Sequence, residues 1–319
     1  MNNKLQKAYQ TMLLNCMGLK PKERVLIITD NGKKDIAKQV FQEAFKLCKA
    51  VKLHEMPVME RNGQEPPAEV AEEMKKFDVV FLITTFSLSH TKARREASAA
   101  GARIASMPGI TREIIQRCIP VDYNRMKARI NRLCDYFDQG KRVAVTTKKG
   151  TNLEFSIVGR KGHGRKGGIY DKKGYWGNLP CGEAFVAPVE GTANGVLVVD
   201  GPIASIGKVD KNAVIEIQDG FATKFSGGKA AKLLEEKLKR VGKLAFNVAE
   251  FGIGANEKAK ITGTVLEDEK VLGTIHVAFG NNVSMEGKVD VPVHIDCVVK
   301  RPNIWIDEKK IMQDGKILI

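Results

Sequence analysis

Two kinds of hydrophobic pattern alternate along the first 138 residues. Continuous apolar runs at residues 24–30 and 79–84 are typical of strands that are buried on both faces of a parallel sheet. Residues 4–17 and 35–48 instead place their apolar side chains at helical spacing. This alternation of strands and helices predicts a doubly wound, mostly parallel α/β domain over residues 1–138.

From residue 139 onward the pattern changes to short strands that are separated by glycine-containing turns. Residues 142–147 and 152–157 alternate apolar and polar positions on either side of a turn and are expected to form a hairpin. Residues 228–241 form the one clear helical pattern in this half. The second predicted domain, residues 139–319, is therefore a β-rich α+β domain.

The chain is strongly basic, with a formal net charge of +15, which raises the question of nucleic acid binding. Lysine is spread along the whole chain, however, and only 6% of the residues are aromatic. The densest basic run, residues 160–168, lacks the aromatic residues on which bases stack, so we interpret it as a solvated loop and expect no nucleic-acid partner. Its GxGxxG pattern is followed by residues that open no helix, which excludes a dinucleotide fingerprint.

Neither end nor interior of the chain resembles a membrane or export segment. No apolar run reaches about 18 residues, and the N-terminal residues lack the apolar stretch of a signal peptide. The six cysteines form no CxxC pair. We therefore expect a cytoplasmic protein with reduced thiols and no membrane partner.

The strongest chemical signal is a group of histidine and aspartate residues near the C-terminus. His294 and Asp296 lie two residues apart in a predicted strand, so their side chains point to the same face. His276 lies in another predicted strand, residues 273–280. Together the three residues would form the two-histidine, one-carboxylate set that recurs in catalytic metal sites.

Two glutamates extend this group of candidate metal ligands. Glu183 follows a tight turn and leads into an apolar segment, and Glu250 lies between an apolar strand and a glycine-rich loop. A carboxylate among apolar residues is costly to bury unless it is paired or binds a metal. The enlarged set of Glu183, Glu250, His276, His294 and Asp296 suits one or two divalent ions such as Zn²⁺, Mn²⁺ or Co²⁺.

Five short motifs in this half occur in the same order in one enzyme family. They are, in chain order, NLPCGE at 178–183, EFGIG at 250–254, LEDEK at 266–270, HVAFG at 276–280 and HID at 294–296. This series resembles the M29 metallo-aminopeptidases of the aminopeptidase T and aminopeptidase S type. The resemblance implies that Glu183, Glu250, His276, His294 and Asp296 bind two divalent metals, and that the protein is a homodimer.

An aminopeptidase of this kind would hydrolyse the N-terminal residue of a peptide with a metal-activated water. We expect Glu250 to be the catalytic residue, which would accept the proton of that water and pass it to the leaving amine. The expected partner is a peptide or another small-molecule substrate.

One departure from the family leaves two alternatives open. The family carries a tyrosine seven residues after the first histidine, where this chain has Val283. The dihydroxypyridine ring-cleaving dioxygenases resemble M29 proteins in sequence but use Fe(II), and His276, His294 and Asp296 would form their kind of facial triad. A further alternative is a non-enzymatic basic binding protein whose metal site is structural or vestigial.

Overall fold

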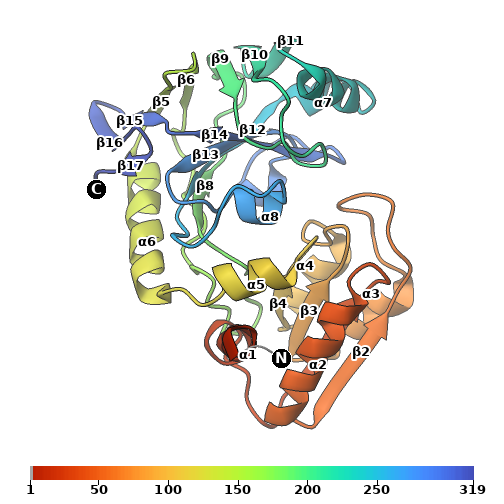
Figure 1. Ribbon diagram of the computed structural model, residues 1–319. Helices are drawn as coiled ribbons and strands as arrows, with labels where there is room; N and C mark the ends of the chain where they lie inside the picture. Colours follow the sequence, from red (N-terminus) through yellow and green to blue (C-terminus); the bar gives the residue numbers. More distant parts are fainter. Residues whose placement is uncertain (1–2) are drawn as a thin grey trace. The chain divides into compact units, whose positions relative to one another are not determined.

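The computed structural model describes residues 3–319, and the chain divides into two compact units (Figure 1). The first unit runs to Tyr123 and includes Gly168–Cys181, while the second consists of Asn124–Gly167 and Gly182–Ile319. This division differs from the predicted boundary after residue 138. The helix α6 (Tyr123–Gln139) belongs almost entirely to the second unit rather than closing the first.

The first unit contains a five-stranded parallel sheet with the strand order β2-β1-β3-β4-β7. Its strands are β1 (Arg24–Thr29), β2 (Ala50–Glu55), β3 (Val79–Ile83), β4 (Arg103–Ser106) and β7 (Trp176–Asn178). Every residue of β3 and all but the first of β1 are buried, as the continuous apolar runs predicted.

Helices cover both faces of this sheet. They are α1 (Asn3–Gln10), which continues as the π-helix η1 (Thr11–Cys16), α2 (Lys34–Leu47), α3 (Ala68–Met74), α4 (Lys92–Ala99) and α5 (Arg112–Cys118). Side chains of α3 and α4 share one apolar core with Leu26, Val80 and Ile104 of the sheet. The helix α2 contacts β1, β2 and β3.

The strand β7 explains why the first unit includes a segment from the second half of the chain. It pairs in parallel with β4, with Ala105 opposite Gly177. Gly177 leaves room for Tyr170, because a Cβ at this position would lie 2.2 Å from the Tyr170 Oη. The added strand extends the parallel sheet by a pairing between distant parts of the sequence, which no local pattern predicts.

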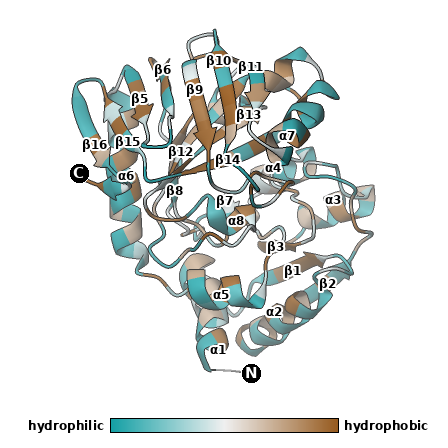
Figure 2. Ribbon diagram, turned by 45° about the horizontal axis from the view of Figure 1, so that its top comes forward, coloured by the Kyte–Doolittle hydropathy of each residue, from teal (hydrophilic) through white to brown (hydrophobic). Residues whose placement is uncertain are grey.

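The second unit contains an antiparallel sheet of eight strands in the order β11-β10-β9-β6-β5-β15-β16-β17. The strands are β5 (Arg142–Thr146), β6 (Asn152–Ser156), β9 (Asn194–Val199), β10 (Ala213–Gln218), β11 (Phe221–Ser226), β15 (Asn303–Ile306), β16 (Lys309–Gln313) and β17 (Lys316–Ile317). β5 and β6 form the predicted hairpin, and β9 is among its most apolar strands (Figure 2).

A second, four-stranded antiparallel sheet in this unit has the order β14-β13-β12-β8. Its strands are β8 (Glu183–Val186), β12 (Val248–Gly254), β13 (Thr274–Gly280) and β14 (His294–Lys300). All residues of β12 and β13 are buried.

Besides α6, this unit contains one longer helix, α7, and three short helices. They are α7 (Lys229–Lys239), α8 (Val265–Asp268) and the 3-10 helices η2 (Lys243–Phe246) and η3 (Val283–Met285). The predicted fold class, a parallel α/β domain together with a β-rich domain, is confirmed. Among residues 3–319, no helix has the length and apolar character needed to cross a bilayer.

Candidate metal centre

All five predicted metal ligands project from the four-stranded sheet. Glu183 begins β8, Glu250 lies in β12, His276 in β13, and His294 and Asp296 in β14. The antiparallel register places Glu250 and Asp296 on either side of one residue, Ala278. The strand pairing therefore gathers side chains that are up to 113 positions apart in the sequence (183 to 296) on one sheet.

Small residues separate these long side chains on the sheet. Gly254 lies opposite Glu183, Gly252 opposite His276, and Gly280 opposite His294. The Gly252 position is filled by the imidazole of its partner, because a Cβ there would lie 2.0 Å from the His276 Nε2. Gly252 thus leaves room for a candidate ligand, whereas a Cβ at Gly254 or Gly280 would meet the backbone carbonyl of Val271 or Val293.

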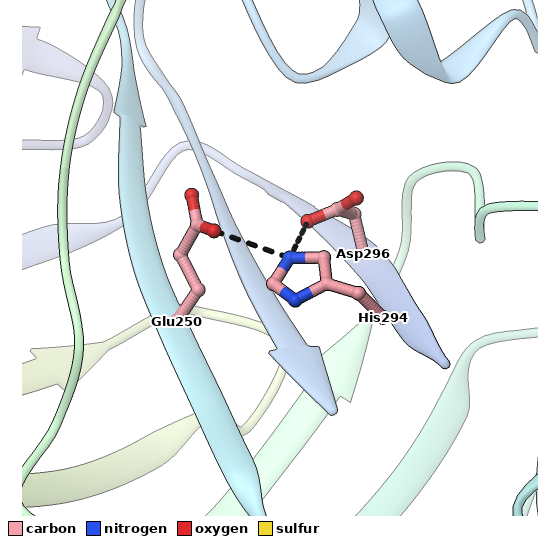
Figure 3. A group of neighbouring side chains, drawn as sticks. All are labelled: Glu250, His294 and Asp296. Atoms are coloured by element: carbon pink, nitrogen blue, oxygen red, sulfur yellow. Dashed lines mark ion pairs between the residues drawn. The ribbon is translucent and has the colours of Figure 1, made fainter. Parts of the chain in front are cut away.

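Glu250, His294 and Asp296 form the most compact part of the site (Figure 3). The His294 Nε2 lies 3.1 Å from the Glu250 Oε2 and 3.5 Å from the Asp296 Oδ1. One ligand atom from each residue falls within 4.8 Å of the others. Their side chains are only 10%, 16% and 14% exposed, so an ion held here would be largely shielded from water.

His276 joins this group through Glu250. Its Nε2 lies 3.2 Å from the Glu250 Oε1 and 3.6 Å from the Glu183 Oε2. The Nδ1 of the same ring is buried and has no hydrogen-bond partner among the described residues, and neither does the Glu183 Oε2. Two imidazoles thus share one carboxylate, in a donor set that suits a divalent metal.

The electrostatics of the cluster follow from its close packing. Burial disfavours the charged imidazole of His276, but the hydrogen bond with Glu250 and the charges of Glu183 and Glu250 outweigh it and raise its pKa to about 9. Burial would raise the pKa of Glu250, yet hydrogen bonds from His276 and His294 lower it below its usual range. The pKa of His294 is likewise raised, against burial, by Asp296 and Glu250.

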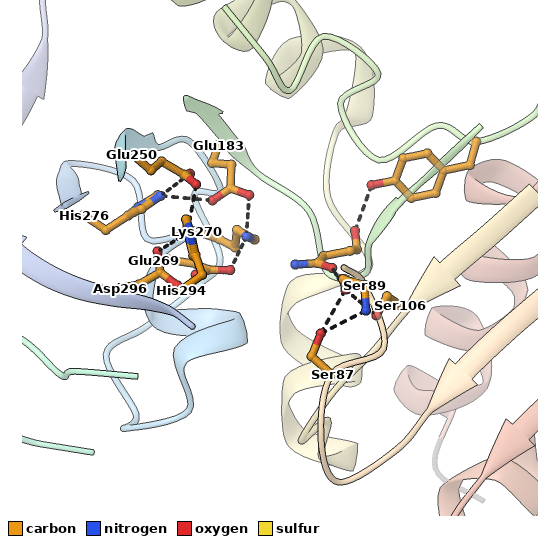
Figure 4. Close-up of polar contacts among 12 residues, drawn as sticks. Ser87, Ser89, Ser106, Glu183, Glu250, Glu269, Lys270, His276, His294 and Asp296 are labelled. Carbon is orange, nitrogen blue, oxygen red and sulfur yellow. Dashed lines mark hydrogen bonds and ion pairs between the residues drawn. The ribbon is translucent and has the colours of Figure 1, made fainter. Parts of the chain in front are cut away.

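The cluster also contains a lysine to which the sequence analysis assigned no role. Lys270 lies within the LEDEK motif, and its side chain is 1% exposed. Its Nζ lies 2.6 Å from the Glu183 Oε1 and also contacts the Glu269 Oε1 (Figure 4). Burial raises the pKa of Glu269 to about 8, an effect to which the charge of Glu183 adds and which that of Lys270 opposes.

The basic run at residues 160–168 is not the solvated loop that we expected. Arg160 is 9% exposed and forms an ion pair with Glu190, and Arg165 forms ion pairs with Asp135 and Asp138. Carboxylates distant in sequence therefore hold the run in place, which its composition alone did not reveal.

His163, in the same run, is a second residue for which sequence spacing gave no signal. Its backbone forms two hydrogen bonds with Phe185 of β8, and its ring stacks on that phenyl ring with centroids 5.4 Å apart. The His163 Nε2 is buried without a hydrogen-bond partner among residues 3–319. Burial lowers the pKa of this imidazole and so favours its neutral form.

Val283, which stands where the M29 family carries a tyrosine, lies in η3 with 43% of its surface exposed. Its isopropyl side chain can donate no hydrogen bond to a reaction centre. The hydroxyl group that the family tyrosine would supply is therefore missing at this position.

A separate polar cluster lies at the carboxyl ends of the parallel strands of the first unit. The Ser89 Oγ forms hydrogen bonds with the Ser106 Oγ (2.7 Å) and with the Asn178 Oδ1 (3.2 Å), which ties β7 to β4 (Figure 4). Asp30, after β1, accepts hydrogen bonds from the backbone N–H and the hydroxyl of Thr85. These groups satisfy one another, as expected for turns and caps.

Comparison with known proteins gives one family over nearly the whole chain. The family model described as NicX, 2,5-dihydroxypyridine 5,6-dioxygenase, matches residues 4–319. A 2,5-dihydroxypyridine 5,6-dioxygenase of Pseudomonas putida (strain KT2440) is 25% identical over 254 residues, which are 74% of this chain and 70% of that protein.

Solved structures show the same fold. The structure of a 2,5-dihydroxypyridine dioxygenase from Pseudomonas putida KT2440 has a TM-score of 0.84 at 20% identity and covers 98% of this chain and 96% of its own. Wild-type AmpT from Thermus thermophilus has a TM-score of 0.75 at 16% identity, with 99% of each chain covered. At these identities both likenesses concern the fold alone.

These comparisons correct the main functional interpretation. The expected likeness to aminopeptidase T is confirmed for the fold. The prediction of an aminopeptidase, and with it of a protease or hydrolase, is wrong, because the family model and the curated relative both indicate a dioxygenase. The alternative based on Fe(II) is the better supported one.

Proposed function

Because this chain belongs to the 2,5-dihydroxypyridine 5,6-dioxygenase family, we propose that it is an Fe(II)-dependent dioxygenase that uses O₂ to open the ring of a dihydroxylated pyridine. The observation that carries this proposal is the buried cluster of two imidazoles and their carboxylates on one four-stranded sheet. Iron of this class is held by two histidines and one carboxylate with positions left open for substrate and O₂.

The donor set fits such a metal. His276, His294 and Asp296 supply the two imidazoles and the carboxylate, and Glu250 contacts both imidazoles. The buried His276 Nδ1 and Glu183 Oε2, which have no hydrogen-bond partner among residues 3–319, show that the polar groups of the cluster do not satisfy one another. Bound Fe(II) would supply the electron transfer to O₂ that no side chain can perform.

Glu250 would face the same metal ion as the two histidines. Its Oε1 lies 3.2 Å from the His276 Nε2 and its Oε2 lies 3.1 Å from the His294 Nε2. The His294 Nδ1 lies 2.7 Å from the Asn281 carbonyl oxygen, so the Nε2 is the nitrogen that would bind a metal. Because its pKa is lowered, this carboxylate remains ionised across the neutral range. The role of Glu250 in this proposal is to hold the metal together with the two histidines, in place of the proton transfer that the aminopeptidase interpretation assigned to it.

Two further groups would orient a dihydroxypyridine. The Glu183 Oε2 and the His163 Nε2 are both buried without a hydrogen-bond partner within the described chain, so each can bind a ring hydroxyl or ring nitrogen. His163 and Phe185 stack with an interplanar angle of 22° and offer flat apolar faces beside these polar atoms. A planar aromatic substrate with two hydroxyl groups matches both features.

The proposal is tested by loading metal-free protein with Fe(II) under anaerobic conditions and then adding 2,5-dihydroxypyridine and O₂. We expect one O₂ to be consumed for each ring, with loss of the ring's ultraviolet absorbance. Aminoacyl amides serve as the comparison substrate and should remain intact. Amide cleavage without O₂ consumption, or no O₂ uptake with any dihydroxypyridine, would contradict the proposal.

A matched pair of variants links that activity to the cluster. Asp296→Asn removes one negative charge at a proposed ligand and should lower O₂ uptake at least about 100-fold, by analogy with the loss that even outer partners of metal ligands cause. Asp219→Asn, at a turn between β10 and β11, should leave the rate unchanged. Equal rates for Asp296→Asn and the unmodified protein would exclude Asp296 from the site.

A further inference from the structure

The buried ammonium group of Lys270 lies among carboxylates that could otherwise bind a cation. Its Nζ lies 2.6 Å from the Glu183 Oε1 and contacts Glu269 as well, while the other oxygen of Glu183 lies 3.6 Å from the His276 Nε2 (Figure 4). Lys270 is therefore separated from the candidate metal ligands by a single carboxylate group.

The backbone around Lys270 fixes this position. The carbonyl of Lys270 accepts a hydrogen bond from the Asn256 N–H (2.8 Å), and the Leu272 N–H donates to the Asn256 carbonyl (3.1 Å). The Val271 carbonyl approaches β12 so closely that a Cβ at Gly254 would lie 2.0 Å from its oxygen. These backbone contacts direct the Lys270 side chain toward Glu183, the residue that pairs with Gly254.

A lysine and a divalent metal ion compete for the same carboxylates. An ammonium group donates up to three hydrogen bonds and carries one positive charge, and the Lys270 Nζ already contacts one oxygen of Glu183 and one of Glu269. A second cation coordinated by the same oxygens would lie within a few ångströms of this charge and would be repelled. Lysine and a second metal ion therefore exclude each other at the Glu183 Oε1.

We propose that Lys270 takes the place of a second metal ion, so that the cluster binds one divalent cation and Glu183 is held away from it. The single ion is held among Glu250, His276, His294 and Asp296. The inference deepens the proposed dioxygenase function, since it leaves the Glu183 Oε2 available for the substrate. It also revises the expectation that Glu183 is a metal ligand.

The number of ions bound at saturation tests the proposal. Metal-free protein is titrated with Zn²⁺, followed by calorimetry and by counting bound metal after dialysis. The unmodified chain should bind one ion, and Lys270→Met, which removes the charge and keeps the length, should bind two. Lys149→Met, a control lysine of the same unit whose Nζ lies 3.0 Å from the Asp200 Oδ2, should bind one.

Two ions in the unmodified chain, or one ion in folded Lys270→Met, would overturn the proposal. Adding Glu183→Gln to Lys270→Met should remove the second ion again. None of these measurements uses O₂ or a pyridine, so they stand apart from the test of the dioxygenase activity.

Glu183→Gln alone keeps the question open to experiment if Lys270→Met does not fold. With Glu183 outside the coordination sphere, its loss should weaken Zn²⁺ binding by no more than about 10-fold, the lower range for outer partners of metal ligands. Glu250→Gln should weaken it at least about 100-fold. Equal losses for the two variants would make Glu183 a ligand and contradict the proposal.

Discussion

At the scale of single residues, the site needs small residues beside its polar side chains. Glu250 and Asp296 flank Ala278, and Gly252 faces the ring of His276. A larger residue at either position would occupy the space of a candidate ligand. Gly252 of the EFGIG motif is therefore needed because it leaves space for the His276 ring, and not because it makes the strand flexible.

The substitution Gly252→Ala tests this interpretation. Its Cβ would lie 2.0 Å from the His276 Nε2, so the imidazole must shift out of hydrogen-bond distance to Glu250. We expect divalent-metal affinity to fall at least about 10-fold, and the free energy of unfolding to fall by about 1–3 kcal/mol from overpacking. Calorimetric metal titration and urea denaturation measure the two effects.

Ile253→Val, at the next position of β12, is the control for that substitution. Ile253 is buried and points to the opposite face of the strand from Gly252. It should cost about 0.5–1.5 kcal/mol of stability and leave metal affinity unchanged. If both variants bind metal as well as the unmodified chain, steric contact with His276 has no role in the site.

At the scale of elements, helix caps complete the parallel α/β unit. The Thr91 side chain accepts a hydrogen bond from the Arg94 N–H at the start of α4, and its hydroxyl donates to the Leu88 carbonyl. The Thr111 side chain caps α5 in the same way through the Ile114 N–H. Threonine at both N-caps is what helix starts of this type prefer.

Thr91→Ala should therefore lower the free energy of unfolding by about 1 kcal/mol, because both hydrogen bonds of its hydroxyl are lost in a buried position. Thr91→Ser keeps the hydroxyl and should cost much less. Equilibrium denaturation followed by circular dichroism compares the two, and equal stability would mean that the cap contributes nothing.

At the scale of the whole molecule, burial makes the cysteine thiols unreactive. All six cysteines are buried. Burial raises the pKa of Cys16 to about 12 and does the same for Cys134. At pH 8 the thiolate fraction of such a group is on the order of 10⁻⁴, and only the thiolate is nucleophilic.

Iodoacetamide at pH 8 should accordingly leave the native protein unmodified for hours and label all six cysteines after denaturation, as counted by mass spectrometry. Raising the pH to 9.5 should still spare Cys16 and Cys134, since the folded pKa lies above that value and an unperturbed thiol would be largely ionised. Rapid labelling of either residue in the native protein would contradict the burial.

The expected homodimer stays a prediction for light scattering to measure.

The sequence by itself determined the two fold classes and identified the candidate metal ligands. Buried parallel strands such as β1 and β3 are apolar on both faces, and the strand alternation of β14 places His294 and Asp296 together. These features follow from the local spacing of apolar and polar residues, which is visible without the tertiary structure. The five candidate ligands were also identifiable by residue type.

Only the tertiary structure decided how those residues combine. The pairing of β7 with β4, the position of Lys270 beside Glu183 and the stacking of His163 on Phe185 join segments that are distant in sequence. Such contacts depend on strand order and register, which leave no periodic signal. From the sequence, the candidate ligands could bind either one or two metals. The tertiary contacts add a lysine, Lys270, to this set.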